Sequence, residues 1–552
     1  MKSYNNILIA ASAVLMLFAS CKDDNFLKES LNDRLNTENA YTNKAQFDAL
    51  SAAMYRSVQM MYNTADLTHE AWILGLGTDV CFDPRDDAAK FNNWGLVNAD
   101  EPFSTDWFNN MYVIIKNANY LIEFGSKPSV IWASATEKNQ TLAEAYFFRG
   151  FAYRCLANLY GGVPIVDKPV TEAKVDFVKS TREEVWAFAK NDLEFARLNL
   201  PLTTASPGRV VRAAADHILS EVNISLKDYD GAIAAATRVI DGTDGSYALV
   251  NARFGARAAE ADKNYYYDLF VMGNQNRQTG NTEGIFVAQF EQGPTGAVVN
   301  GGTIYASRPL IERMMWCNFW GLVKAGYSGT AVDSTGRGVA YARPTNFTNY
   351  TIWKNSGNDI RNNEINIKRK YYFAADIKDA GGNILFRKQD LIPKSFLTTR
   401  DDTMIYVYPN WAKFGTDKHI AAKPDNGYVR DFYVIRLPET YFLRAEARLA
   451  KGGQAQLAAD DINAVRARAN ATPVAAANVT LDYILDERAR ELYGEEFRMM
   501  TLTRLGKLYE RTKAYGYEKS AASVQPFNNL MPLPLTFITR NVGAKIDNNP
   551  GY

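Results

Sequence analysis

The sequence predicts a mainly α protein, in which tetratricopeptide-like helical pairs support a large insertion that is rich in loops and partly β. Three observations predict this class. Apolar residues recur at helical spacing in residues 41–241 and again in residues 431–552. Short turns join consecutive helices in both parts, with alanine at close-packing positions. The intervening residues 242–430 are rich in Gly, Asn, Thr and aromatic side chains, and only short strand-like runs occur there.

The N-terminal helical part, residues 41–241, begins with an apolar stripe that has Thr42 and Asn43 before it as candidate helix caps. The "DYDG" turn separates its last two predicted helices, and Ala232 and Ala236 lie on one face of the second. A helix, a turn and a helix with small contact residues follow the tetratricopeptide plan, in which stacked pairs bury one another. The helical spacing recurs in residues 47–61, 107–121, 145–159, 185–200, 211–226 and 232–240.

The C-terminal helical part, residues 431–552, repeats this plan. The segment "LPETYFLRAEARLAKGG" predicts a helix with Leu437 and Leu449 on one face, and Gly452 and Gly453 end it. Further helices are expected over residues 458–469 and 481–492. Residues 242–430 are therefore expected to interrupt one helical array and to present a candidate ligand-binding face, with "GIFVAQF" as the clearest strand.

The first residues have the pattern of an export signal. Lys2 precedes an apolar run from Ile7 to Ala19, which is shorter than the roughly 20 residues that span a bilayer. Residues 1–20 are therefore predicted to be a signal peptide. The tetrapeptide Phe18-Ala19-Ser20-Cys21 resembles the lipobox of bacterial lipoproteins, which implies that Cys21 is acylated and that residues 21–40 form a lipid anchor and tether. An ordinary signal peptide that ends beside a chance cysteine is the alternative.

Composition and motifs exclude several classes of function. The 62 basic and 61 acidic residues give a net charge of +1, and no basic run is present to bind nucleic acid. The three histidines, His69, His217 and His419, are isolated, and no metal, phosphate-binding or nucleophile motif occurs. The sequence therefore predicts no catalytic residue, no cofactor and no metal site. We expect small buried apolar side chains at Cys81, Cys155 and Cys317.

Two groups of acidic residues leave alternatives open. A structural Ca²⁺ could bind the carboxylates of Asp79, Asp83, Asp86 and Asp87, although a solvated polar loop is the favoured interpretation. In residues 486–498, "DERARELYGEEFR", charges at three- and four-residue spacing predict a salt-bridge network more than a carboxylate acid/base pair. These charges are Glu487, Arg488, Arg490, Glu491, Glu495 and Arg498.

Aromatic residues outside the helical stripes are candidates for ligand contact. An aromatic ring stacks on the C–H face of a sugar, while a neighbouring amide such as that of Asn93 bonds its hydroxyl groups. Burial in the core is the alternative for each ring. Trp107 and Trp186 lie on predicted helices and are expected to be packing residues. The candidate ligand-binding set is Asn93, Trp94, Trp316, Trp320, Tyr350 and Trp353.

Several segments together resemble the SusD/RagB family of surface lipoproteins. They are "CKDDNFL" at 21–27, "LYGGVPIV" at 159–166, "RPT" at 343–345, "DIRNNEINIKR" at 359–369, "VIRLPETYFLRAEARL" at 434–449, "INAVRARA" at 462–469, "ERARELYGEEFR" at 487–498 and "NNPGY" at 548–552. The resemblance implies a helical, tetratricopeptide-like fold with a loop-rich face.

It also implies a non-catalytic protein on the outside of the outer membrane, anchored at Cys21. Such a protein captures an oligosaccharide or polysaccharide and passes it to a SusC-like TonB-dependent transporter. Some family members look like peptide binders, so a peptide-binding importer of the same architecture is the alternative. A surface glycoside hydrolase is a further alternative without a supporting motif.

Overall fold

The computed structural model describes residues 41–62, 70–86, 90–290, 311–324, 327–329, 336–417 and 430–552. The predicted signal peptide, Cys21 and the tether lie outside these residues, as do His69, Asp87 and His419. None of the helices in the described ranges is both long enough and apolar enough to cross a bilayer.

The N-terminal helices match the predicted apolar stripes. The first begins after Asn43, whose side chain accepts from the backbone N–H of Gln46, while the Gln46 side chain accepts from the Asn43 N–H. This reciprocal capping box explains why the helix starts there. Trp107 and Trp186 are buried packing residues, as predicted. The helices are α2 (Lys44–Met60), α3 (Pro102–Gly125), α4 (Ala135–Tyr160), α5 (Arg182–Asn199), α6 (Arg212–Ser225) and α7 (Tyr229–Ile240).

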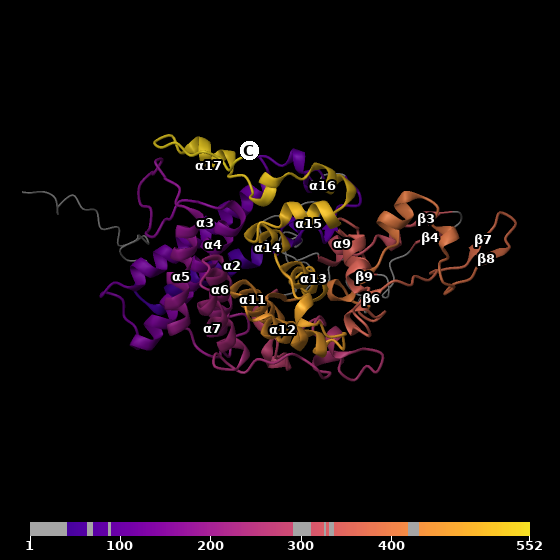
Figure 1. Cartoon of the computed structure of the whole chain (residues 1–552), viewed down its shortest axis with the longest axis horizontal. Helices are drawn as coiled ribbons and strands as arrows, with labels where there is room; N and C mark the ends of the chain where they lie inside the picture. Colours follow the sequence, from indigo (N-terminus) through magenta and orange to yellow (C-terminus); the bar gives the residue numbers. More distant parts are fainter. Residues whose placement is uncertain are drawn as a thin grey trace, which may run out of the picture.

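The helical array is continuous in space although residues 241–436 separate its two parts in sequence. Helix α11 (Leu437–Lys451) packs directly on α7, and α12 (Ala455–Arg468) packs on α11 (Figure 1). Ala232 of α7 and Ala447 of α11 lie in one buried cluster, because small residues let the two helices approach closely. This arrangement confirms the predicted mainly α, tetratricopeptide-like fold class.

The remaining C-terminal helices cover the array and return to its N-terminal half. Figure 1 shows α17 beyond α3, and the rings of Phe537 and Phe108 contact each other with centroids 5.2 Å apart. Near the chain end, the Asn549 side chain donates to the carbonyl of Tyr160, where α4 ends. These helices are α13 (Leu481–Leu492), α14 (Arg498–Arg504), α15 (Leu508–Tyr515), α16 (Glu518–Ser523) and α17 (Leu535–Arg540).

The middle of the chain contains short antiparallel strand pairs. The predicted strand is present as β2 (Gly284–Ala288), which pairs with β10 (Phe432–Arg436) just before α11. The other pairs are β1 (Cys81–Phe82) with β5 (Arg343–Pro344), β3 (Val323–Lys324) with β4 (Tyr327–Ser328), β6 (Ile367–Lys368) with β9 (Asn410–Trp411), and β7 (Ile377–Lys378) with β8 (Ile384–Phe386). Short helices α8 (Tyr265–Asp268), α9 (Ile311–Met315) and α10 (Asn346–Asn349) lie between them.

A second hydrophobic core holds part of this loop-rich region together. Its rings include Phe319, Tyr371, Phe373 and Phe396, and the centroids of Phe373 and Phe396 lie 5.0 Å apart. The aromatic richness of the sequence is thus used largely for packing. The three cysteines Cys81, Cys155 and Cys317 are free and buried, as expected.

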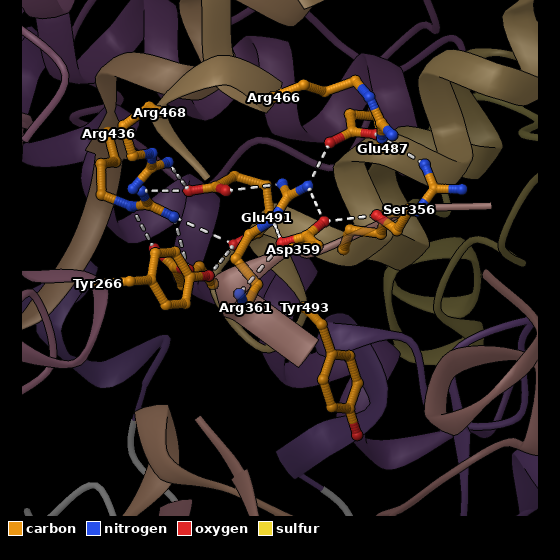
Figure 2. A network of polar contacts seen from close by, with 12 residues as sticks. Tyr266, Ser356, Asp359, Arg361, Arg436, Arg466, Arg468, Glu487, Glu491 and Tyr493 are labelled. Atoms are coloured by element: carbon orange, nitrogen blue, oxygen red, sulfur yellow. Dashed lines mark hydrogen bonds and ion pairs between the residues drawn. The ribbon is translucent and has the colours of Figure 1, made fainter. Parts of the chain in front are cut away.

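A buried network of ion pairs joins the insertion to the C-terminal helices (Figure 2). Arg361 lies between two carboxylates of α13, with its Nη2 2.8 Å from Glu487 Oε1 and its Nη1 3.0 Å from Glu491 Oε2. Arg436, at the end of β10, reaches Glu491 Oε1 at 2.6 Å, and Arg466 of α12 reaches Glu487 Oε2 at 2.6 Å. A salt-bridge network is present as predicted, but most of its partners come from distant segments instead of from the same helix.

The charges of this network compensate one another inside the protein. Burial alone would raise the pKa of Glu487, but the guanidinium groups of Arg361, Arg490 and Arg466 outweigh burial and hold that pKa at about 2. Arg490, three residues along α13, supplies an intrahelical pair at 2.7 Å. Carboxylates that are bound to arginine in this way are poor candidates for an acid/base pair.

Candidate ligand-binding surface

Three of the predicted ligand-binding residues, Trp94, Trp316 and Trp353, are core residues. Trp94 is 1% exposed, and the other two are also buried. Their indole N–H groups donate to the backbone carbonyls of Gly77, Trp411 and Thr348, respectively, at 2.8–2.9 Å. The prediction of ligand contact is wrong for these three residues, because their rings fill the interior beneath polar loops.

The other three predicted residues are exposed. Trp320 is 37% exposed, and its indole N–H donates to the Gly338 carbonyl at 2.8 Å. Tyr350 is 50% exposed. The side chain of Asn93 accepts from the N–H of Gly95 at 3.1 Å, so it caps a short 3₁₀ turn. Trp320 and Tyr350 thus keep ring surface available to a ligand, whereas the Asn93 carbonyl oxygen is engaged in local structure.

Strand pairing brings two distant loop regions together. In the β1–β5 pair, Phe82 lies directly opposite Arg343. A few residues beyond β1, the Nε–H of Arg85 donates to the carbonyl of Val339 at 2.8 Å. The loop that follows β1 and the segment before β5 therefore form one surface.

Tyr341 and Arg343 face the same side of that segment. Ala340 and Ala342 are fully buried, while Tyr341 and Arg343 are half-buried, as the alternation of an extended chain requires. The Arg85 guanidinium lies over the Tyr341 ring, 5.2 Å from its centroid. The Tyr341 ring thus supports the Arg85 cation on its face, while the Nη nitrogens of Arg85 stay free to donate hydrogen bonds.

The Arg343 guanidinium lies between two rings. It is 5.5 Å from the centroid of Phe82 and 5.6 Å from that of Tyr408. Burial lowers the pKa of Arg343, and the hydroxyl groups of Tyr408 and Tyr350 oppose that shift, which places Tyr350 within electrostatic range of this cation. Its Nε is buried without a hydrogen-bond partner.

Arg400 is the third arginine on this side of the protein. Tyr517 stacks on Phe82, with centroids 4.3 Å apart and planes inclined by 7°. A hydrogen bond with Tyr517 is the largest cause of the raised pKa of Arg400, whose Nη2 also donates to the Pro84 carbonyl at 3.3 Å. We call the half-buried and exposed members of this assembly, Arg85, Tyr341, Arg343, Arg400 and Tyr517, the Arg343 surface; Trp320 and Tyr350 adjoin it.

The arginines and tyrosines of the Arg343 surface were not among the predicted site residues. The tripeptide "RPT" at 343–345 is one of the family-like segments, yet nothing local to it indicates a binding role. A signal was available in the alternation of small and large residues in "AYAR", 340–343, which is typical of a half-exposed extended segment. The contribution of Arg85 and Arg400 depends on contacts across the fold.

Three of the four acidic residues considered for Ca²⁺ have other partners, and the fourth, Asp87, lies outside the described residues. Asp79 is buried, with Oδ1 3.1 Å from Arg498 Nε and Oδ2 3.0 Å from Arg511 Nε, and these cations outweigh burial and hold its pKa at about 2. Asp83 is also buried and accepts from the Arg85 backbone N–H at 2.9 Å, and Asp86 pairs with Lys519. Asp79 and Asp83 are therefore not parts of a solvated loop.

The described ranges contain no group of three histidine, cysteine, aspartate or glutamate side chains arranged to hold a metal. The Nδ1 of His217, the one histidine in these ranges, lies 2.8 Å from Thr440 Oγ1 in the interior.

The chain belongs to the SusD/RagB family. Two family models match it: the SusD family over residues 282–552, and a family described as starch-binding and associating with the outer membrane over residues 85–223.

SusD-like protein P2 of Formosa agariphila is 24% identical over 475 residues, which cover 84% of this chain and 83% of that protein. A laminarin-binding SusD-like protein of known structure is 21% identical, with a TM-score of 0.66 over 93% of this chain and all of its own. A SusD homologue from Bacteroides thetaiotaomicron is 17% identical, with a TM-score of 0.69 over 94% and 99% of the two chains. The structural likenesses show the shared fold.

Proposed function

We propose that this protein is a cell-surface glycan-binding lipoprotein that captures an oligosaccharide or polysaccharide and delivers it to a SusC-like TonB-dependent transporter. The observation that carries the proposal is the Arg343 surface with its two adjoining exposed rings. Tyr350 is within electrostatic range of Arg343, and Trp320 bonds Gly338, the residue before the Val339 that Arg85 binds. Rings that stack on sugar faces and guanidinium groups that donate to hydroxyls together suit a carbohydrate. The laminarin-binding relative supports this ligand class.

The anchoring part of the proposal concerns residues outside the described ranges. Residues 1–20 are removed as a signal peptide, Cys21 carries the acyl chains, and residues 21–40 tether the folded part to the exterior of the outer membrane. The family description of association with the outer membrane supports this location. Mass spectrometry of the protein from native membranes tests it: an N-terminus other than an acylated Cys21 would refute the anchor.

The ligand face is wider than the insertion that was expected to carry it. Residues 41–241, 242–430 and 431–552 remain our division into an N-terminal helical part, an insertion and a C-terminal helical part. The Arg343 surface draws on all three, because Arg85 comes from the first, Arg343 from the second and Tyr517 from the third. A ligand seated there would contact each of them.

A binding role without catalysis agrees with the state of the acidic residues. The carboxylates of α13 that could have served as an acid/base pair are buried and bound to arginines. Incubation of the purified protein with glycans and analysis of the products tests the hydrolase alternative. Released oligosaccharides would identify an enzyme.

Isothermal titration against a panel of polysaccharides and peptides tests the proposed function. Trp320→Ala and Tyr350→Ala are each expected to weaken glycan binding by at least about twofold, the lower end of the range for an aromatic contact. Phe527→Ala is a matched control, because Phe527 is 38% exposed but packs against Tyr552 at the chain end. Binding of peptides and of no glycan would replace the proposal by a peptide-binding importer.

Unchanged affinity in both aromatic variants, in a protein that still binds glycan, would remove the site but not the function. Co-purification of the membrane form with a TonB-dependent transporter tests the delivery step. Recovery of this protein without a transporter from gently solubilised membranes would contradict a stable partnership.

A further inference from the structure

The side chain of Arg343 differs from those of Arg361 and Arg436 in having no hydrogen-bond or ion-pair partner among the described residues. Arg361 and Arg436 are each held by two or more carboxylates at 2.6–3.0 Å. The guanidinium group of Arg343 forms no hydrogen bond or ion pair with any residue in the described ranges, and its buried Nε lacks an acceptor. Its terminal nitrogens are not among the buried unpaired atoms, so they reach the surface.

The aromatic rings around Arg343 remove water without supplying a negative charge. The guanidinium carbon of Arg343 lies over the rings of Phe82 and Tyr408, and each ring offers only the weak attraction of its π face. A cation that is partly withdrawn from water costs free energy unless an anion accompanies it. The fold therefore leaves Arg343 in a state that an incoming anion would stabilise.

The acidic groups nearby are already committed. Asp401 pairs with Arg400 at 3.0 Å on the surface, and Asp83 accepts the backbone N–H of Arg85 at 2.9 Å from a buried position. Arg85, like Arg343, has no carboxylate within ion-pair distance among the described residues. Among the described residues, two positive charges on this surface thus lack a paired carboxylate. Their Nη nitrogens are available for hydrogen bonds, whereas the Nε of Arg85 already donates to Val339 and the Nε of Arg343 is buried.

We propose that the glycan bound at the Arg343 surface is anionic, and that Arg343 and Arg85 receive its carboxylate or sulfate groups while Trp320 and Tyr350 stack on its sugar rings. This inference rests on the proposed function. A guanidinium group donates two parallel hydrogen bonds to a carboxylate or a sulfate ester, and such charge-assisted bonds strengthen where water is excluded. The burial of Arg343, which lowers its pKa, agrees with a cation prepared for an anionic ligand.

Glycan pairs that differ only in charge test the inference. Polygalacturonate and its methyl ester share one backbone, as do dextran sulfate and dextran, so these arms distinguish carboxylate from sulfate as the source of the charge. Laminarin serves as a neutral glycan and polyglutamate as an acidic chain without sugar. We expect at least one acidic glycan to bind more tightly than its uncharged counterpart, and its affinity to fall as salt rises from about 0.05 to 0.5 M.

Arg343→Gln removes the charge but keeps a long polar side chain. It is expected to weaken binding of the acidic glycan by about 10- to 100-fold, the range for hydrogen bonds to a charged group. Arg277→Gln is the matched control, because Arg277 also lies over a tyrosine, at 4.4 Å from the Tyr247 centroid, and its Nη2 donates to a backbone carbonyl, that of Ser246. This control changes net charge equally and should leave the affinity unchanged.

The possible results separate the two proposals. Equal binding of charged and uncharged glycans, or binding of laminarin alone, would overturn the anionic ligand and leave the proposed function in place. Failure of every acidic glycan to bind would also overturn the anionic ligand. Binding of polyglutamate and of no glycan would overturn both the anionic glycan ligand and the proposed glycan-binding function. Because Arg343→Gln could alter the fold, thermal unfolding of the variant and a second variant, Arg85→Gln, accompany the titrations; equal affinity in both folded variants would refute the assigned arginines.

Discussion

Glu491→Gln removes one buried negative charge while the size of the side chain stays nearly constant. The carboxylate of Glu491 contacts Arg361 at 3.0 Å, Arg436 at 2.6 Å and also Arg468, all of them buried. An amide can accept from one of these guanidinium groups, but its NH₂ group faces donors of the same kind. The variant thus leaves buried cations without their shared anion.

The expected loss follows from the cost of breaking a buried ion pair. Removal of one partner typically lowers the free energy of unfolding by about 3–5 kcal/mol. At about 2.1 cal/mol/K per residue, the total entropy of unfolding of a chain of this length is roughly 1 kcal/mol/K. The melting temperature should therefore fall by about 4 °C.

Differential scanning calorimetry at pH 7 measures this change. Glu510→Gln is the matched control, because Glu510 forms an exposed pair with Lys507 on α15 and should contribute less than about 1 kcal/mol. Equal melting temperatures for Glu491→Gln and the unaltered protein would show that the network does not depend on this carboxylate. An equal decrease for Glu510→Gln would show that burial is not the cause.

Three further outcomes are expected. Trp353→Ala should lower the free energy of unfolding by about 3–5 kcal/mol, because it leaves a cavity in the packed site beside Trp411. Trp320→Ala should cost less because Trp320 is exposed, and equal losses in denaturant titrations of the two variants would contradict this. Burial and Asp216 raise the pKa of Asp244 to about 7, so its contribution to stability is present below its unfolded pKa of about 3.9 and is lost as pH rises through 7. Asp244→Asn should therefore melt above the unaltered protein at pH 8 and lose that advantage as pH falls to about 4, and a difference independent of pH would refute this. Gly494→Ala should lower the melting temperature more than Gly382→Ala. Both glycines have positive φ, but only at Gly494 would a Cβ meet the Phe414 ring, at 2.2 Å, so similar decreases in the two variants would exclude the clash as the cause.

The helices could be predicted because their signals are local. The capping box at Asn43 and the apolar stripe that follows lie within one helix, and the repeated helix–turn–helix plan predicted that α7 and α11 belong to one array. The buried network was harder, because Glu487 and Glu491 take arginines from segments far away in sequence. Spacing along one helix cannot identify such partners.

The ligand-binding residues depend on exposure, which composition does not report. Trp94 and Trp320 both lie in aromatic, asparagine-containing loops, yet one is buried and the other is not. The Arg343 surface arises from strands of only two residues, which have no periodicity of their own. Contacts such as that of Arg85 with Val339 follow from that pairing and could not be predicted before it was known.

The closeness of α7 and α11 has a consequence for how this fold can be re-engineered. Because the two helices are neighbours, everything between them leaves and rejoins the scaffold at nearly one place, and a chimera could exchange that stretch without stretching the helical stack. The exchanged stretch must nevertheless bring an arginine to the place of Arg361. Without that arginine, Glu487 would lose one of its three arginine partners. A chimera with new binding specificity must therefore keep the buried Arg361–Glu487 ion pair as well as exchange the exposed loops.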